Sequence, residues 1–264
     1  MIPGPSSTFR HPRCGTRGFT LVELIVALAI ALFLLGGLAM ILQNTRKANV
    51  NQQSLAMLQD EQRFAMTVLT DVIQQGGYYP SGLPQAQTLT QDTALLPAGA
   101  PFGGQVAMQG GQAFDGSHPG GAAPDSLTVR FMTTSGDGLI RCDGSSNTAV
   151  VDEQDTNVFS IVVPAGNVPG QLQCSLNGNA PVTLVNGIQN LVVYFGVNRN
   201  APGANYNVDT YLTADQMNAA DWMNVSSVRI VLWFTNPLAG QPGQQPTILF
   251  ERVVPVMGRA GYHS

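Results

Sequence analysis

One long apolar run, residues 19–42, constrains the fold of this chain more than any other feature. Its 24 residues include one ionisable side chain, Glu23, and one hydroxyl side chain, Thr20. A helix of about 20 apolar residues crosses the hydrocarbon core of a bilayer, so the run predicts a transmembrane helix. A carboxylate costs about 2.5–3.5 kcal/mol at the membrane centre and less near its surface. The position of Glu23 therefore indicates that this residue has a function and a partner.

The segment before the apolar run is basic. Residues 1–18 contain Arg10, Arg13 and Arg17 and no acidic residue, and the excess of basic residues on cytoplasmic segments predicts that they stay in the cytoplasm. A secretory signal peptide is cleaved after its apolar stretch, at small residues. In this chain a glycine, Gly18, stands before the apolar stretch instead, and no such cleavage site clearly follows it.

The sequence Gly-Phe-Thr-Leu-Val-Glu at residues 18–23 resembles the cleavage motif of type IV prepilins and pseudopilins. The resemblance implies that residues 1–18 are a leader peptide, that a prepilin peptidase cuts between Gly18 and Phe19, and that the new Phe19 amine is methylated. It further suggests that the Glu23 carboxylate pairs with the Phe19 amine of an adjacent subunit during assembly. The alternatives are a plain N-terminal anchor with an accidental glycine, and a Glu23 that only lies at the lipid headgroups.

The predicted helix continues beyond the membrane. From residue 43 the chain is polar but contains no proline until Pro80, and apolar residues recur at steps of three, four or seven: Leu55, Leu58, Ala65, Leu69 and Val72. This spacing predicts an amphipathic helix that ends at Gly76-Gly77. We expect residues 19–42 to form the transmembrane and assembly half of a stem, and residues 43–76 its periplasmic half.

The remainder of the chain predicts a β-rich domain. Residues 77–124 are rich in Gly and Pro and are expected to form a long surface loop with a short strand near residues 105–108. Alternating or continuous apolar residues then predict strands near residues 125–132, 158–163, 182–185, 187–197, 225–235 and 247–256. Thr213-Ala214-Asp215-Gln216 fits the capping box of a short helix reaching about Trp222. The order predicts an α+β, pilin-like fold, with one long N-terminal helix and an antiparallel β-sheet head in residues 125–264.

The number of cysteines in the mature chain depends on the cleavage. Cys14 lies in the leader, so the mature chain retains Cys142 and Cys174. In an oxidising compartment these two residues are predicted to form a disulfide; the alternative is two buried free thiols. The sequence contains no CxxC or HExxH pattern, so neither a metal site nor a cofactor is predicted.

Charge and residue usage argue against several functions. Loss of the three leader arginines lowers the count of Lys and Arg from 12 to 9 and moves the net charge from −4 to −7. Because Lys47 is the only lysine, a broad basic surface for nucleic acid is not expected. The mature chain has only His118 and His263 as histidines and lacks G-x-S-x-G and P-loop motifs, so we expect no enzyme activity.

An acidic segment at residues 152–155, Asp-Glu-Gln-Asp, offers oxygen ligands of the kind that calcium prefers. It lacks the glycine and the terminal glutamate of an EF-hand loop. The favoured interpretation is a solvated acidic turn.

Later segments resemble the PilW family of minor pilins. Residues 59–65, Gln-Asp-Glu-Gln-Arg-Phe-Ala, leading into residues 71–78, Asp-Val-Ile-Gln-Gln-Gly-Gly-Tyr, resemble the end of the family's stem, with one extra glycine. Residues 185–191 with Tyr194, residues 228–232 and residues 250–254 resemble strands of its sheet. The family usually ends near a basic Arg-Asn-Arg, which residues 258–260, Gly-Arg-Ala, match only in part.

The resemblance implies a minor pilin that spans the inner membrane once, with its head in the periplasm, and later enters the pilus at the cell surface. The function it implies is the initiation of type IV pilus assembly, with a location at the fibre tip. The implied partners are other minor pilins, the major pilin, the prepilin peptidase, the inner-membrane assembly platform and membrane lipid. Two alternatives are a minor pseudopilin of a type II secretion system and a tip adhesin.

Overall fold

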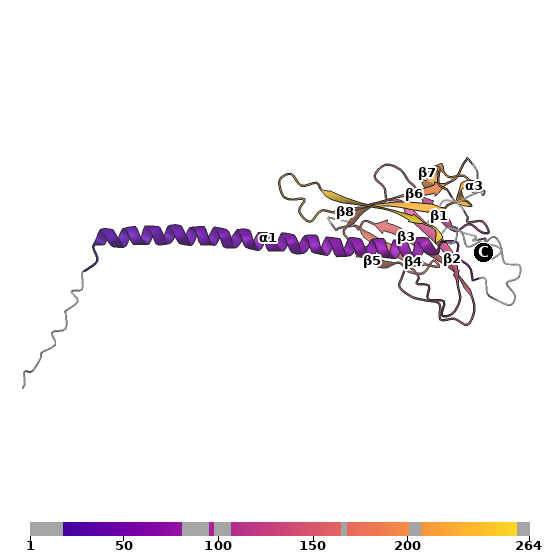
Figure 1. Ribbon diagram of the computed structural model, residues 1–264, viewed down its shortest axis with the longest axis horizontal. Helices are drawn as coiled ribbons and strands as arrows, with labels where there is room; N and C mark the ends of the chain where they lie inside the picture. The colour runs from indigo at the N-terminus through magenta and orange to yellow at the C-terminus, as the bar shows by residue number, and fades with distance from the viewer. Residues whose placement is uncertain (1–17, 81–94, 98–106, 165–167, 201–206, 258–264) are drawn as a thin grey trace, which may run out of the picture. The chain divides into compact units, whose positions relative to one another are not determined.

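The computed structural model describes residues 18–80, 95–97, 107–164, 168–200 and 207–257. One long helix leads into a series of strands (Figure 1). Within the described residues the elements are α1 (Leu21–Gln75), β1 (Phe114–Ser117), β2 (Ser126–Thr133), β3 (Glu153–Val162), β4 (Gln171–Leu176), β5 (Val182–Asn186), β6 (Ile188–Val197), β7 (Thr210–Leu212), η2 (Ala214–Gln216), α3 (Ala219–Trp222), β8 (Ser227–Thr235) and β9 (Thr247–Pro255). Residues 1–17 of the predicted leader, which ends at Gly18, lie outside this description.

The chain divides into two compact units, one up to Gln52 and the other from Gln53 onward. In the first unit every described side chain from Gly18 to Val50 is exposed. These include large apolar side chains such as Phe33, which is 82% exposed. An apolar helix surface of this kind needs lipid or other helices around it.

The second unit begins with the amphipathic part of α1. Its buried residues are Leu58, Ala65, Met66, Leu69, Val72 and Ile73. They include four of the five positions that the apolar spacing predicts, and the fifth, Leu55, is half-buried. The helix ends at Gln75, and Gly77 follows in the left-handed conformation with φ 78°, which glycine adopts without strain. The Gly77 N–H donates to the carbonyl of Arg130 in β2 at 2.9 Å, which fixes the end of the helix on the sheet.

The strands of the head form two antiparallel sheets, whereas the sequence pattern predicts a single sheet. The first sheet has the order β1-β2-β3-β4-β5, and the second has the order β7-β6-β8-β9. A single residue, Gly187, separates β5 from β6, and its φ of 81° turns the chain from the first sheet into the second. Because the turn is a single residue, the apolar residues of β5 and β6 form an almost continuous run in the sequence.

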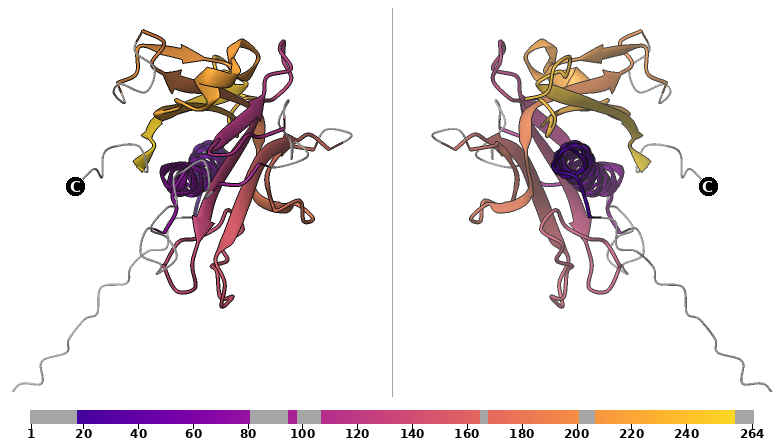
Figure 2. Two further views of the ribbon diagram at one scale, coloured as in Figure 1. Left: turned by 90° about the vertical axis from the view of Figure 1, so that its right-hand side faces the viewer. Right: turned by 90° about the vertical axis from the view of Figure 1, so that its left-hand side faces the viewer.

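One apolar core lies between the two sheets and the part of α1 from Gln53 onward (Figure 2). Each sheet contributes fully buried aromatic rings to it, among them Phe131 and Phe159 from the first sheet and Phe195 and Phe234 from the second. The register of the second sheet places Leu191 opposite Leu232. Burial of rings and aliphatic side chains on this scale is the main source of the stability of such a head.

The segment predicted as a loop, residues 77–124, is more ordered than expected where it is described. It contains strand β1, and Leu95, Met108 and Ala113 are buried. This segment covers the second face of β2, so β2 is buried on both faces instead of one. Of the short strand expected near residues 105–108, residues 105 and 106 lie outside the description, and residues 107 and 108 form no strand.

Three smaller elements also differ from expectation. Strands β4 and β7 were not predicted. The predicted short helix is two separate turns: η2, with the capping box of Thr213 and Gln216, and α3, capped by Asn218. The break has a simple cause, since Met217 and Asn218 between them adopt extended backbone conformations.

Candidate processing and assembly site

The N-terminal motif lies at the start of α1, and Thr20 caps this helix. The Thr20 carbonyl accepts a hydrogen bond from the Leu24 N–H at 3.2 Å, and its Oγ1 accepts one from the Glu23 N–H at 3.3 Å. The Thr-x-x-Glu spacing is that of a capping box, a signal that the sequence analysis missed although it lies within the motif. The cap fixes Glu23 in the first helical turn, where the helix dipole favours a carboxylate.

Phe19 and Glu23 are both exposed, Phe19 to 81%. The ion pairs found among the described residues do not include Glu23. Its partner in the assembled state, the Phe19 amine of an adjacent subunit, stays a prediction. The exposure of both groups is compatible with a contact made by another molecule.

Gly18 occupies an open position. A Cβ atom added there would meet no described heavy atom within 4 Å, and the backbone is not in the left-handed conformation. Folding of the described residues therefore gives no reason for a glycine at this position. Recognition by a processing enzyme is the explanation that the sequence motif offers.

Among the described residues, α1 is the one helix that is long and apolar enough to cross a membrane. None of its most apolar 18-residue window is buried. The core helix of a soluble domain would be mostly buried, so burial separates α1 from that class of helix. A signal sequence has a similar length and composition, but α1 runs without interruption to Gln75, within the second unit.

The predicted disulfide is present in the head. It joins Cys142, in the connection between β2 and β3, to Cys174 in β4, with a Cα–Cα distance of 6.0 Å. Both cysteines are 1% exposed. The Cys142 N–H also donates to Asn157 Oδ1 at 2.9 Å, so the connection is held to β3 by a hydrogen bond as well as to β4 by the disulfide.

The interpretation of residues 152–155 as a solvated acidic turn is wrong for Asp155. Glu153 and Asp155 lie in β3, and the Asp155 side chain is 0% exposed. Arg141 binds both: its Nε lies 2.6 Å from Asp155 Oδ2 and its Nη2 lies 2.5 Å from Glu153 Oε2. Burial alone would lower the pKa of Arg141, but the two carboxylates raise it. Sequence reasoning could not pair Arg141 with Asp155, because their spacing of 14 residues matches no local pattern.

His118 has a structural partner. Its Nδ1 lies 2.7 Å from Asp125 Oδ1, while Asp125 Oδ2 accepts a hydrogen bond from the Val193 N–H of β6 at 2.9 Å. Burial raises the pKa of Asp125, and the contacts with Val193 and His118 oppose this shift. The pair thus links the β1–β2 turn to the second sheet. His263 lies outside the described residues, and those residues contain no group of three or more His, Cys, Asp or Glu side chains suited to a metal ion.

An exposed apolar helix with a prepilin-type start, followed by an antiparallel β head, defines the class of pilin-like proteins. Comparison with protein families supports this class at both ends of the chain. Residues 13–39 match the prokaryotic N-terminal methylation motif, and residues 158–256, from within β3 to just beyond β9, match the type IV pilus-assembly protein W family, PilW. The resemblance to PilW minor pilins is confirmed by these two matches. None of the curated proteins compared with the chain matches it.

Proposed function

We propose that this chain is a minor pilin that takes part in starting type IV pilus assembly from the inner membrane. The observation that carries the proposal is the start of α1: a methylation motif whose Gly18 has no packing role is joined to a helix whose apolar half is entirely exposed. The match to a pilus-assembly family over residues 158–256 favours the pilus over a type II secretion system. We interpret the protein as structural, without an enzymatic activity.

In this proposal the apolar half of α1 is held in the inner membrane, and the head with its disulfide lies in the periplasm. Assembly moves the helix from lipid into a bundle of neighbouring stems. In that bundle the Glu23 carboxylate pairs with the methylated Phe19 amine of an adjacent subunit. Pairing removes two isolated charges from an apolar environment, and loss of one member of such a pair costs about 3–5 kcal/mol.

The proposed position is at the start of the fibre, in a priming complex that stays at the tip. A head of this size suits the end of a fibre better than regular stacking along its shaft. The proposed partners are other minor pilins, the major pilin, the prepilin peptidase and the inner-membrane assembly platform. Loss of this chain is then expected to reduce surface pili while leaving type II secretion unchanged, and the opposite pattern would favour the pseudopilin alternative.

The first experiment is intact mass and N-terminal sequencing of the protein from host membranes under non-reducing conditions. We expect a chain that starts at N-methyl-Phe19 and is lighter than the reduced form by two hydrogen atoms, because of the Cys142–Cys174 disulfide. A chain that starts at Met1, or one cut after the apolar run, would contradict the proposal.

A second experiment tests the role of Glu23. The Glu23→Ala variant should be cleaved normally but enter sheared pili at a strongly reduced level, because the Phe19 amine would then be buried without a partner. Glu251→Ala, which removes a carboxylate from the exposed face of β9, is the matched control and should enter pili normally. Normal incorporation of the Glu23→Ala variant would refute the pairing.

A further inference from the structure

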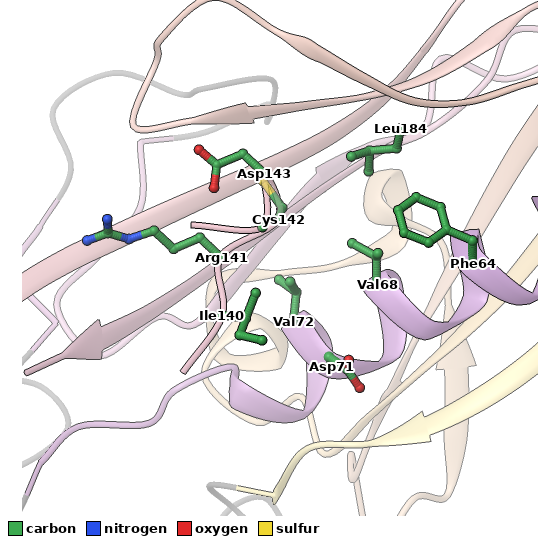
Figure 3. A pocket seen from close by; sticks show the side chains of 10 residues that line it. Phe64, Val68, Asp71, Val72, Ile140, Arg141, Cys142, Asp143 and Leu184 are labelled. Carbon is green, nitrogen blue, oxygen red and sulfur yellow. The ribbon is translucent and has the colours of Figure 1, made fainter. Parts of the chain in front are cut away.

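A pocket of about 320 Å³ lies in the head, away from the residues that carry the proposed function. Phe64, Val68 and Val72 form its wall on α1, and Ile140 and Leu184 lie across from them on the β2–β3 connection and on β5 (Figure 3). The buried disulfide at Cys142 lines the pocket as well, so its shape is held by a covalent bond.

Apolar surface continues from this pocket along α1. Phe64 is 50% exposed and Met57, seven residues earlier, is 57% exposed. Asp71 follows seven residues after Phe64, and a step of seven returns to the same helix face. Met57 and Phe64 thus lie one heptad apart on one face of α1, a spacing at which two exposed apolar side chains can contact the same second helix. We call the surface made by Met57, Phe64 and the pocket the stem groove.

Two of the three charged residues that line the pocket are acidic. Asp71 and Asp143 line the pocket and are exposed, and Asp60 precedes Phe64 by one helical turn. Arg141 also lines the pocket, but its guanidinium group is bound to Asp155 and Glu153. The nearest basic residue on α1, Arg63, is rotated from Phe64 by about 100° around the helix axis. A partner with apolar side chains flanked by lysine or arginine complements this surface.

We propose that the stem groove binds the polar half of the stem helix of a different pilin subunit. That helix would present apolar side chains at i, i+3 or i+4, and i+7, with a basic residue placed beside Asp71 and Asp143. The proposal rests on the proposed function, because assembly is what brings a neighbouring stem beside α1. If a second copy of this chain packed here in register, its acidic residues would lie against the acidic residues of the stem groove. Like charges in contact disfavour that pairing.

The test uses the full chain in cells that produce the pilus machinery. The photoreactive amino acid p-benzoylphenylalanine replaces Phe64, the cells are irradiated, and the crosslinked peptides are identified by mass spectrometry. We expect an adduct on the polar half of the stem helix of another pilin. The matched control carries the same amino acid at Leu249 on β9, which is exposed to the same 50% as Phe64, and should give no such adduct. Ile140 lies on the opposite wall and is 53% exposed. Placing p-benzoylphenylalanine there should give an adduct on the same stem helix of the partner pilin.

A charge variant tests the basic partner. Asp71→Lys combined with Asp143→Lys should lower the Phe64 crosslinking yield by about tenfold, because like charges at an interface are strongly unfavourable. Asp152→Lys combined with Glu251→Lys changes the net charge equally at residues that do not line the pocket, and should leave the yield unchanged.

Several outcomes would overturn the inference. Adducts only on lipid, on a second copy of this chain or on the head of another subunit would do so, as would no adduct from a chain that is cleaved and incorporated into pili. N-terminal sequencing of the same sample separates this failure from failure of the proposed function. If the chain does not start at Phe19, the proposed function is refuted and the inference is refuted with it.

Discussion

At the scale of single residues, Asp155 and Arg141 form the most deeply buried of the ion pairs found among the described residues. The side chains are 0% and 11% exposed. Asp155 also accepts hydrogen bonds from Thr133 and from Asn177, at 3.3 Å and 3.0 Å. One buried carboxylate thereby joins the ends of three neighbouring segments: β2, the β2–β3 connection and the turn after β4.

Replacing Asp155 with alanine should destabilise the head by about 3 kcal/mol, the lower end of the range for breaking a buried ion pair, because Glu153 continues to neutralise Arg141. The loss of stability is measured as a shift in the midpoint of urea unfolding of the detergent-solubilised chain. Tryptophan fluorescence follows the unfolding, since Trp222 and Trp233 both lie in the head. Glu251→Ala breaks the exposed Arg229–Glu251 pair and should shift the midpoint much less. Equal shifts would show that burial of the pair has no energetic consequence.

Arg130 is a second buried charge, at 0% exposure. Its guanidinium group donates to the carbonyl oxygens of Leu96, Gln109 and Gln112, at 2.6 Å, 2.7 Å and 2.5 Å. These contacts fix the segment that covers β2. Burial lowers the pKa of Arg130 to about 10, and the charge of Asp115 on β1 opposes this shift.

Asp115 makes the stability of the head depend on pH. Burial raises its pKa from 3.8 to about 6, although the Gly116 N–H and the charge of Arg130 act in the opposite direction. Neither carboxylate oxygen has a partner at hydrogen-bonding geometry among the described residues. The folded state thus binds the proton more tightly than the unfolded state does. The tighter proton binding of Asp115 stabilises the folded head fully below about pH 4, and this stabilisation is lost as the pH rises through about 6.

We therefore expect the Asp115→Asn variant to gain stability relative to the unmodified chain as the pH rises from 4.5 to 7.5. The urea midpoints of both proteins across this range give the difference. Asp209→Asn is the control. The Asn200 and Arg199 N–H groups lower the pKa of Asp209, so the stability difference between this variant and the unmodified chain should change mainly below pH 4. Parallel midpoint profiles of Asp115→Asn and the unmodified chain would contradict the assignment.

At the scale of elements, a long alternation of apolar residues locates the ends of a strand well. Strands β6 and β8 each carry four or more alternating apolar residues and were predicted almost to their ends. Strand β1 has four residues, two of which are Asp115 and Gly116, and β7 has three residues, so neither produces a pattern. The division into two sheets depends on pairings such as Ile188 with Phe234, which local periodicity does not report.

The candidate site also has a part that could be predicted from local sequence and a part that could not. Its N-terminal part is contiguous, so the motif at residues 18–23 could be read directly, apart from the capping role of Thr20. The Cys142–Cys174 disulfide could be predicted because the third cysteine, Cys14, lies in the predicted leader. The stem groove could not be predicted, because it joins residues of α1 to Ile140 and Leu184, more than 60 positions away in the sequence.

The junction of α1 with β1 gives a prediction at this scale. A Cβ atom added at Gly76 would overlap the ring of Phe114, a side chain that is fully buried. Gly76→Ala should therefore destabilise the head by about 1–3 kcal/mol through overpacking. Gly37→Ala makes the same chemical change in α1 at a position with no heavy atom within 4 Å. That control should leave the urea midpoint of the head unchanged, and a similar loss in both variants would contradict the overlap.

For the whole molecule, the two units place opposite demands on their surroundings. The exposed side chains from Leu21 to Leu42 require lipid or other helices, whereas the head buries its own core and its disulfide. In the proposed cycle, cleavage decides which environment the helix can enter. The uncut chain carries Arg10, Arg13 and Arg17 next to the apolar run. Burying these unpaired charges inside an apolar helix bundle is strongly unfavourable.

The Gly18→Ser variant separates folding from processing. A Cβ atom added at Gly18 meets no described heavy atom within 4 Å, so the head should fold and form its disulfide as in the unmodified chain. Intact mass and immunoblots should nevertheless find the uncleaved precursor in the inner membrane and none of the variant in sheared pili. Gly36→Ser introduces the same side chain at an equally open position within α1, and this variant should be cleaved after Gly18 as usual. A Gly18→Ser chain of mature size would show that a different enzyme or site produces the N-terminus. A precursor that still entered pili would show that the free Phe19 amine is not needed for assembly.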